Sequence, residues 1–112
     1  DQVGANHAVL QTLQFFAYDG HVVRRDALLK LASEIRVLRN QLQKSRSFAE
    51  CEIIGSSLLL IFERKTNEIS VKWIDFAHVY KPSSGKKNDG VLYGLDNLVK
   101  ALEDAGKTRG AL

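Results

Sequence analysis

The chain has 112 residues, 45% hydrophobic and 26% charged, a composition typical of one small globular domain or of part of a larger one. No apolar run is long enough to cross a membrane, and no signal peptide is expected. The single cysteine, Cys51, excludes an internal disulfide framework and favours a cytoplasmic or nuclear setting. The net charge of +3 suits an anionic ligand, although an ordinary solvated surface explains so mild an excess equally well. Because the chain lacks methionine, we expect it to be a processed or excised piece.

Apolar residues at helical spacing predict two helices in the first part of the chain. The first covers residues 7–18 and ends at a turn formed by Asp19 and Gly20. The second begins near Asp26 and is long and amphipathic, with an apolar stripe at Leu28, Leu31, Ala32, Ile35, Leu38 and Leu42. The basic residues outside this stripe are expected to form a solvated face; they are Arg36, Arg39 and Lys44.

A β-hairpin is predicted next. Residues 58–62 are an unbroken apolar run, as expected of a strand that is covered on both faces. A polar loop over residues 64–68 leads to residues 69–73, where apolar and polar residues alternate with the period of a strand.

The register of this hairpin decides which polar side chains meet at its end. A loop over residues 64–68 gives the pairs Glu63–Ile69, Leu59–Trp73, Leu58–Ile74 and Ser57–Asp75. Directly opposed side chains point to the same face, so this register brings Ser57 and Asp75 together. A slip of one residue would separate them.

The last part of the chain is predicted to be a loop, a helix and a tail. Residues 81–90 form a flexible basic loop by composition. A helical stripe follows, Gly106 is expected to end that helix, and residues 107–112 form a loose tail. The stripe consists of Leu95, Leu98, Val99 and Leu102. Together the elements predict an α+β fold in which helices cover an antiparallel hairpin, since a hairpin alone is only marginally stable.

Asp75 is the leading candidate for a chemical role. Phosphoryl transfer relies on charge neutralisation by carboxylates, basic side chains and Mg²⁺, and Mg²⁺ favours one or two carboxylates together with phosphates and water. A carboxylate at the end of a buried strand suits this role, with Ser57 and His78 as groups that could bind phosphate. The alternatives are that Asp75 caps a turn or helix, that His78 is structural or exposed, and that Ser56 and Ser57 only begin a strand.

Four blocks of the chain, in order, resemble the C-terminal part of the inositol polyphosphate kinases. They lie at Phe15–Arg25 with the helix that follows, at Glu52–Leu59 (Glu-Ile-Ile-Gly-Ser-Ser-Leu-Leu), at Ile74–His78 (Ile-Asp-Phe-Ala-His) and at Asp89–Leu98, where the last helix starts. The resemblance implies an ATP-dependent kinase of soluble inositol polyphosphates with a two-lobed, protein-kinase-like fold. Residues 1–112 would be a C-terminal segment of the catalytic domain, resembling the C-lobe.

The resemblance also implies roles for individual residues. Asp75 would be the magnesium-binding aspartate. Ser57, with Ser56, would organise the phosphate and metal region, and His78 would lie near the inositol phosphate. The subfamily signals are mixed, because Glu-Ile-Ile-Gly-Ser-Ser resembles the trisphosphate 3-kinases and Asp-Phe-Ala-His resembles the multikinases and hexakisphosphate kinases.

Parts of the family pattern are missing from the chain. The acceptor motif Pro-x-x-x-Asp-x-Lys-x-Gly does not follow Pro82, which is the single proline. The lysine that holds the ATP phosphates and the adenine-binding hinge lie further upstream in the family. We therefore expect the chain alone to be inactive, and an absent N-terminal lobe would leave apolar surface that favours self-association.

Two other classes of function remain open from the sequence. The first is a non-catalytic interaction or regulatory module derived from a kinase fragment. The second is a small basic nucleic-acid binder, suggested by Arg24, Arg25, Arg36 and Arg39. No recognition motif supports the second alternative, so no nucleic-acid partner is expected.

Overall fold

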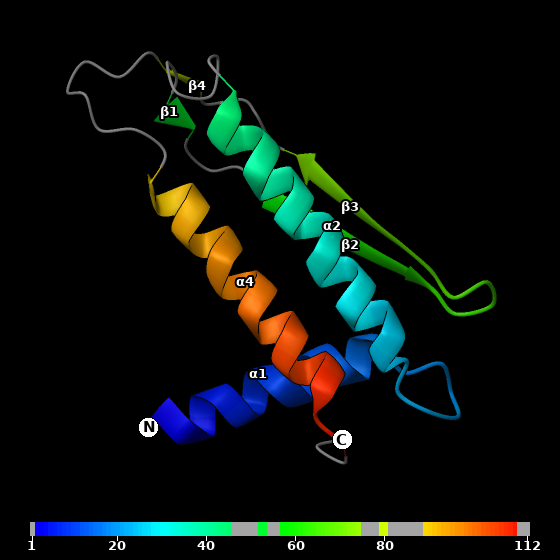
Figure 1. The fold of residues 1–112 in the computed structure, drawn as a ribbon. Coiled ribbons are helices and arrows are strands. Elements are labelled where there is room, and N and C mark those ends of the chain that lie inside the picture. Colours follow the sequence, from blue (N-terminus) through cyan, green and yellow to red (C-terminus); the bar gives the residue numbers. More distant parts are fainter. Residues whose placement is uncertain (1, 46–51, 54–56, 75–78, 81–88, 110–112) are drawn as a thin grey trace.

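A computed structural model describes residues 2–45, 52–53, 57–74, 79–80 and 89–109 (Figure 1). Its helices are α1 (Gln2–Phe16), α2 (Arg25–Lys44) and α4 (Asp89–Lys107), and its strands are β1 (Glu52–Ile53), β2 (Ser57–Glu63), β3 (Glu68–Ile74) and β4 (Val79–Tyr80). The predicted α+β fold, with an antiparallel hairpin packed against helices, is confirmed.

Helix α2 is the centre of the molecule. Figure 1 shows it between the β2–β3 hairpin and α4, with α1 crossing near the end where α2 begins. The predicted stripe faces the core, since Leu28, Leu31 and Ile35 are at most 1% exposed. Full burial of each such side chain stabilises the fold by about 1.5–3 kcal/mol. From α4, the buried partners are Leu95, Val99, Leu102 and Ala105.

Helix α1 begins earlier than expected and ends at Phe16, whereas the sequence predicted a helix over residues 7–18. Its last turn packs against the hairpin, because the centroids of the Phe16 and Phe62 rings lie 6.1 Å apart and the rings are tilted by 49°. This distance is within the range of favourable aromatic pairs. Ala17, directly after the helix, is also buried.

The predicted turn at Asp19 and Gly20 is confirmed. Asp19 Oδ1 accepts hydrogen bonds from the backbone N–H groups of His21 at 2.9 Å and Val22 at 3.0 Å, and Oδ2 accepts one from Arg24 Nε at 2.8 Å. Gly20 has a φ of 101°, a conformation that a residue without Cβ adopts without strain. The pKa of Asp19 is lowered, mainly by the backbone hydrogen bonds from Val22 and His21 and further by Arg24.

The hairpin register differs by one residue from the prediction. Glu63 pairs with Glu68, and Ser57 pairs with Ile74. The loop holds only residues 64–67, because the N–H of Asn67 donates to the Glu63 oxygen at 2.8 Å and closes the turn one residue earlier. Asn67 has a φ of 62°, which asparagine tolerates better than most residues. The predicted pairs that this register overturns are Glu63–Ile69, Leu59–Trp73, Leu58–Ile74 and Ser57–Asp75.

The expectation that β2 is covered on both faces is also wrong. Leu58 and Leu60 are half-buried and pack against the core. Leu59 and Ile61 point to the other face and are 43% and 40% exposed. The physical reason is that α2 covers a single face of the hairpin, and successive side chains of a strand alternate between faces.

Helix α4 begins at Asp89, where the resemblance placed the start of the last helix. Asp89 and Gly90 therefore belong to α4 and not to the predicted loop over residues 81–90, whose other residues lie outside the described ranges. Gly106 does not end α4, which continues to Lys107. Gly106 is instead buried against Leu29 of α2, where there is no space for a Cβ atom.

Two ion pairs join α2 to α4, so the predicted basic face is only partly a solvated surface. Arg36 lies 2.8 Å from Glu103, and Arg39 lies 2.9 Å from Asp96. The hydrogen bond from Arg36 lowers the pKa of Glu103. Both pairs are accessible to solvent, and exposed ion pairs add about 0–1 kcal/mol each.

Candidate functional site

The end of the hairpin at Ser57 and Ile74 leads to the predicted site residues. Ser57 is the first residue of β2, and Ile74 is the last residue of β3. The predicted site residues Ser56, Asp75 and His78 lie outside the described ranges, as does the side chain of Ser57.

Two antiparallel ladders, the seven-pair β2–β3 and the two-pair β1–β4, flank the segments that carry these residues. Beyond residues 54–56 and 75–78, Ile53 of β1 pairs with Val79 of β4 in an antiparallel ladder. The ladder β1–β4 was not expected from the sequence, because two-residue strands give no periodic signal. Residues 54–56, with Ser56, connect β1 to β2 along the chain, and residues 75–78, with Asp75 and His78, connect β3 to β4. Both connections therefore run between the β1–β4 ladder and the β2–β3 ladder.

The two ladders differ in register by one residue. Counting from the pair Ile53–Val79, one residue at a time on each strand, leads to Ser57 opposite Asp75, which is the register predicted for the hairpin. The hairpin itself pairs Ser57 with Ile74. One extra residue therefore lies on the side of Asp75, since four residues separate Ile74 from Val79 and three separate Ile53 from Ser57.

The described side chains offer no cluster of metal ligands. Within those ranges, no three His, Cys, Asp or Glu side chains gather in a way that could hold a metal ion. A site built entirely from such protein ligands is thus absent from that part of the chain. A magnesium ion needs no such cluster, because one or two carboxylates with phosphate oxygens and water satisfy it. The predicted ligand Asp75 fits this simpler donor set by its chemistry.

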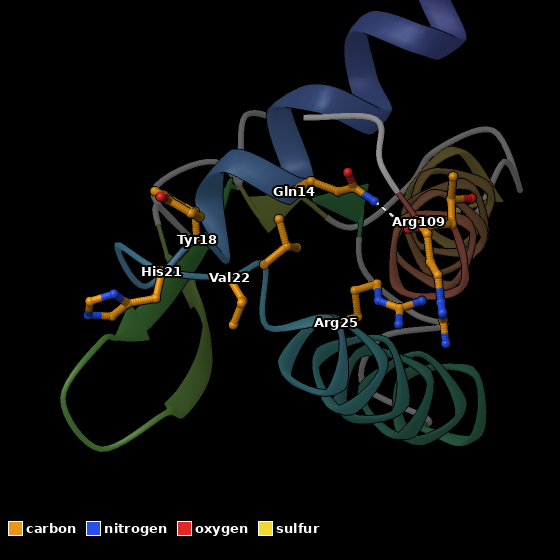
Figure 2. A pocket seen from close by; sticks show the side chains of 8 residues that line it. Gln14, Tyr18, His21, Val22, Arg25 and Arg109 are labelled. Atoms are coloured by element: carbon orange, nitrogen blue, oxygen red, sulfur yellow. Dashed lines mark hydrogen bonds between the residues drawn. The ribbon is translucent and has the colours of Figure 1, made fainter.

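A pocket of about 400 Å³ lies at the other end of the hairpin, near its loop. It is formed where the end of α1, the start of α2 and the residues after α4 meet (Figure 2). The Nε2 of the buried Gln14 donates to the carbonyl oxygens of Ala105 at 3.0 Å and Thr108 at 2.7 Å, and this joins α1 to the end of α4. The lining residues are Gln14, Tyr18, His21, Val22, Val23, Arg25, Thr108 and Arg109.

Sequence reasoning did not find this pocket. Thr108 and Arg109 fall in the predicted loose tail, yet Thr108 is held by Gln14 and by a hydrogen bond from its N–H to the Asp104 oxygen at 3.1 Å. Residues 110–112 of that tail lie outside the described ranges. One signal was present in the sequence, because Gln14 is a polar residue at helical spacing from Leu10 and Ala17 on the apolar side of α1.

The sequence profile of the inositol polyphosphate kinase family matches residues 2–103. The match covers α1, α2, the hairpin and most of α4, so it includes nearly all of the fold described above. The chain therefore belongs to the inositol polyphosphate kinase family.

Individual relatives support the same family. The chain is 32% identical over 104 residues to an inositol-trisphosphate 3-kinase homolog of Caenorhabditis elegans, covering 82% of this chain and 20% of the relative. It is 31% identical over 107 residues to human inositol-trisphosphate 3-kinase C, covering 85% of this chain and 15% of the relative. Mouse inositol-trisphosphate 3-kinase C is 33% identical over 88 residues, which is 68% of this chain and 13% of the relative. The chain thus spans a fifth or less of the length of these relatives.

Proposed function

We propose that the protein is an ATP- and magnesium-dependent kinase of soluble inositol polyphosphates, to which this chain contributes the metal-binding part of the site. The family match over residues 2–103 carries the proposal, because it includes the segment Ile74–His78 at the end of the hairpin. The relatives that are named inositol-trisphosphate 3-kinases support the same reaction class.

Each proposed site residue has its own role. Asp75 would hold Mg²⁺ directly after β3, whose pairing with β2 fixes the backbone at Ile74. Bound Mg²⁺ supplies positive charge that neutralises the transferred phosphoryl group. Ser57 and Ser56 would bind phosphate or metal-bound water at the start of β2, and His78 would lie near the inositol phosphate.

The remainder of the site would come from protein sequence outside this chain. The relatives are at least five times longer than the matched segment, and the acceptor motif and ATP-binding lysine of the family have no counterpart here. A protein-kinase-like N-terminal lobe would supply them, with this chain as part of the C-terminal lobe. That lobe would also cover the exposed apolar side chains Leu59 and Ile61, so the chain on its own is expected to self-associate in sedimentation experiments.

The test is a kinase assay with the full-length protein, labelled ATP, Mg²⁺ and a panel of soluble inositol phosphates. We expect Asp75→Asn to lower turnover by about a hundredfold or more, because it removes a metal-binding charge and keeps the side-chain shape. The matched control is Asp104→Asn, an exposed aspartate on α4 that should leave turnover unchanged. Ser57→Ala should cause a smaller loss than Asp75→Asn.

Two outcomes would contradict the proposal. Near-normal turnover of Asp75→Asn would refute the magnesium role. Normal activity of the isolated 112-residue chain would show that no further lobe is needed.

The cellular setting is part of the same proposal. Soluble inositol phosphates are cytoplasmic or nuclear substrates in this view, and the single cysteine suits a reducing compartment. In the described part of the chain, no helix is both long and apolar enough to span a membrane. Fluorescence imaging of the tagged full-length protein would test the setting, and a secreted pool would contradict it.

A further inference from the structure

Three segments that are distant in the sequence meet around the pocket near the hairpin loop. Gln14 of α1 contacts the carbonyls of Ala105 and Thr108, at the end of α4. The Arg25 backbone oxygen at the start of α2 lies 3.2 Å from where a Cβ of Gly106 would be. These contacts bring Arg25 and Arg109 to the lining of one pocket.

The charged side chains described in this pocket are positive. Among the described residues, its lining contains the positively charged side chains of Arg25 and Arg109 and no carboxylate. Figure 2 shows Arg25 and Arg109 on the same side of the pocket, beside Gln14, with Tyr18 and His21 on the other side. A hollow lined by charges of one sign concentrates ions of the opposite sign.

In the described ranges, the two pocket arginines, like Arg64 of the hairpin loop, lack the ion pairs that three other arginines form. Arg24, Arg36 and Arg39 each form an ion pair with a carboxylate. For Arg25 and Arg109, the described ranges contain no carboxylate partner within ion-pair distance. Two guanidinium groups that share a pocket repel each other. An anion bound between them would attract both groups and offset that repulsion.

The start of α2 adds to the preference for an anion. Its N-cap residue, Arg24, makes no side-chain hydrogen bond to the first turn. The carboxylate of the first turn, Asp26, accepts a hydrogen bond from Asn67 Nδ2 at 3.1 Å and does not line the pocket. The N–H groups of Arg25, Ala27 and Leu28 already donate to the carbonyl oxygens of Val23 and Arg24, so the terminus favours a negative ligand through the positive end of the helix dipole.

We propose that this pocket binds a small molecule that carries a phosphate monoester. A guanidinium group presents forked donors that match phosphate oxygens, and a phosphate monoester has enough terminal oxygens and charge to satisfy two such groups. A carboxylate, with two oxygens and one charge, is satisfied by a single arginine. The volume of about 400 Å³ falls within the usual range for small-ligand sites.

This site lies beyond the proposed function and does not rest on it. The pocket is at the loop end of the hairpin, where Asn67 contacts Asp26. Ser57 is at the opposite end of the seven-residue strand β2, which corresponds to roughly 20 Å of strand length. Binding here would therefore occur away from the kinase site that we propose at the other end.

The test is calorimetric titration of the full-length protein with inorganic phosphate, with acetate and chloride as comparison anions at constant ionic strength. The pH is kept far enough above the second pKa of inorganic phosphate that the dianion, the charge state of a phosphate monoester, predominates. Saturable binding of phosphate, tighter than that of acetate, is expected. Arg25→Gln and Arg109→Gln should each weaken it about tenfold or more, as loss of a charged hydrogen-bond donor predicts.

Two control variants separate this pocket from other sites. Arg64→Gln removes the same charge from an exposed loop residue outside the pocket and should leave phosphate affinity unchanged. Asp75→Asn should also retain it, because Asp75 belongs to the proposed kinase site. The fold of each variant is checked by circular dichroism, and Arg109 is exposed, so its replacement gives a readout even where Arg25→Gln unfolds.

Three results would overturn the proposal. The first is phosphate binding that is no tighter than acetate binding. The second is unchanged affinity in Arg109→Gln, and the third is an equal loss of affinity in Arg64→Gln, which would mean that net charge alone attracts the anion.

Discussion

Replacing Gly106 by alanine tests how closely α2 and α4 pack. A Cβ atom at this position would lie 2.6 Å from Leu29 Cδ2, 2.7 Å from Leu29 Cγ and 3.2 Å from the Arg25 backbone oxygen. The first two distances are shorter than real carbon contacts, so the Leu29 side chain must move. The oxygen belongs to the backbone of α2 and can give way only if the helices separate.

Two opposing contributions set the size of the effect. Replacing glycine by alanine inside a helix gains up to about 1 kcal/mol, and less in a last turn such as this one. Overpacking a closely packed site costs about 1–3 kcal/mol. Because Leu29 is 38% exposed and can rotate towards solvent, we expect a cost near the middle of that range. The net loss in the free energy of unfolding is then about 1 kcal/mol.

The measurement is urea denaturation of the full-length protein followed by circular dichroism. The matched control is Gly94→Ala in the same helix, where no atom lies within 4 Å of the added Cβ. That variant should be more stable by about 0.5–1 kcal/mol. The double variant Leu29→Ala/Gly106→Ala removes the obstructing side chain, so in the Leu29→Ala background the added methyl group should cost little.

The close packing would be refuted by a simple result. If Gly106→Ala stabilises the protein as much as Gly94→Ala does, α2 and α4 are further apart than described. If the cost persists without the Leu29 side chain, the Arg25 backbone oxygen is the main obstruction.

Three further predictions concern single contacts. Gln14→Met should lower the free energy of unfolding by about 1–3 kcal/mol in urea denaturation, because two carbonyl oxygens lose their donor; an unchanged stability would show that water replaces the amide. The pKa of Asp19 is lowered by the N–H groups of Val22 and His21, so its stabilising effect is present above the ordinary pKa of about 4 and is lost as the pH falls through the lowered value. The midpoint of thermal unfolding of Asp19→Asn should therefore fall below that of the parent at neutral pH and converge with it in acid; an equal difference at every pH would contradict the charge-based explanation. Asn67→Ala should cost about 1–2 kcal/mol, because alanine is strained at a φ of 62°. Asn67→Gly should cost less when both are measured by urea denaturation, and equal losses would show that the backbone conformation is not the cause.

The sequence alone was sufficient for the elements whose signal is local. The stripe from Leu28 to Ile35 predicted the buried face of α2, because a helix of 3.6 residues per turn brings these side chains together whatever lies opposite. The turn at Asp19 and Gly20 was also predictable, since Asp19 Oδ1 accepts hydrogen bonds from backbone N–H groups only two and three residues away. The four family blocks identified the family without any structure.

The hairpin register could not be read from its pattern. Residues 58–62 are all apolar, so either register places apolar side chains on the covered face, and the choice was made by the closure of the loop at Asn67. For the same reason, the sequence did not show that Leu59 and Ile61 face away from α2. The pairing of Ser57 with Ile74 followed from that closure, and the roles of Asp75, Ser56 and His78 stay predictions.

The amino-acid sequence therefore determined which helices form, which of their faces are apolar, and to which family the chain belongs. Tertiary structure alone decided the position of Gly106, because a glycine that ends a helix and a glycine that admits a neighbouring Leu29 look the same in sequence. It also decided the pocket between Arg25 and Arg109, since no local pattern relates residues 84 positions apart. Local periodicity depends only on neighbouring residues. Close helix packing and the gathering of charged side chains in one pocket depend on which distant segments meet.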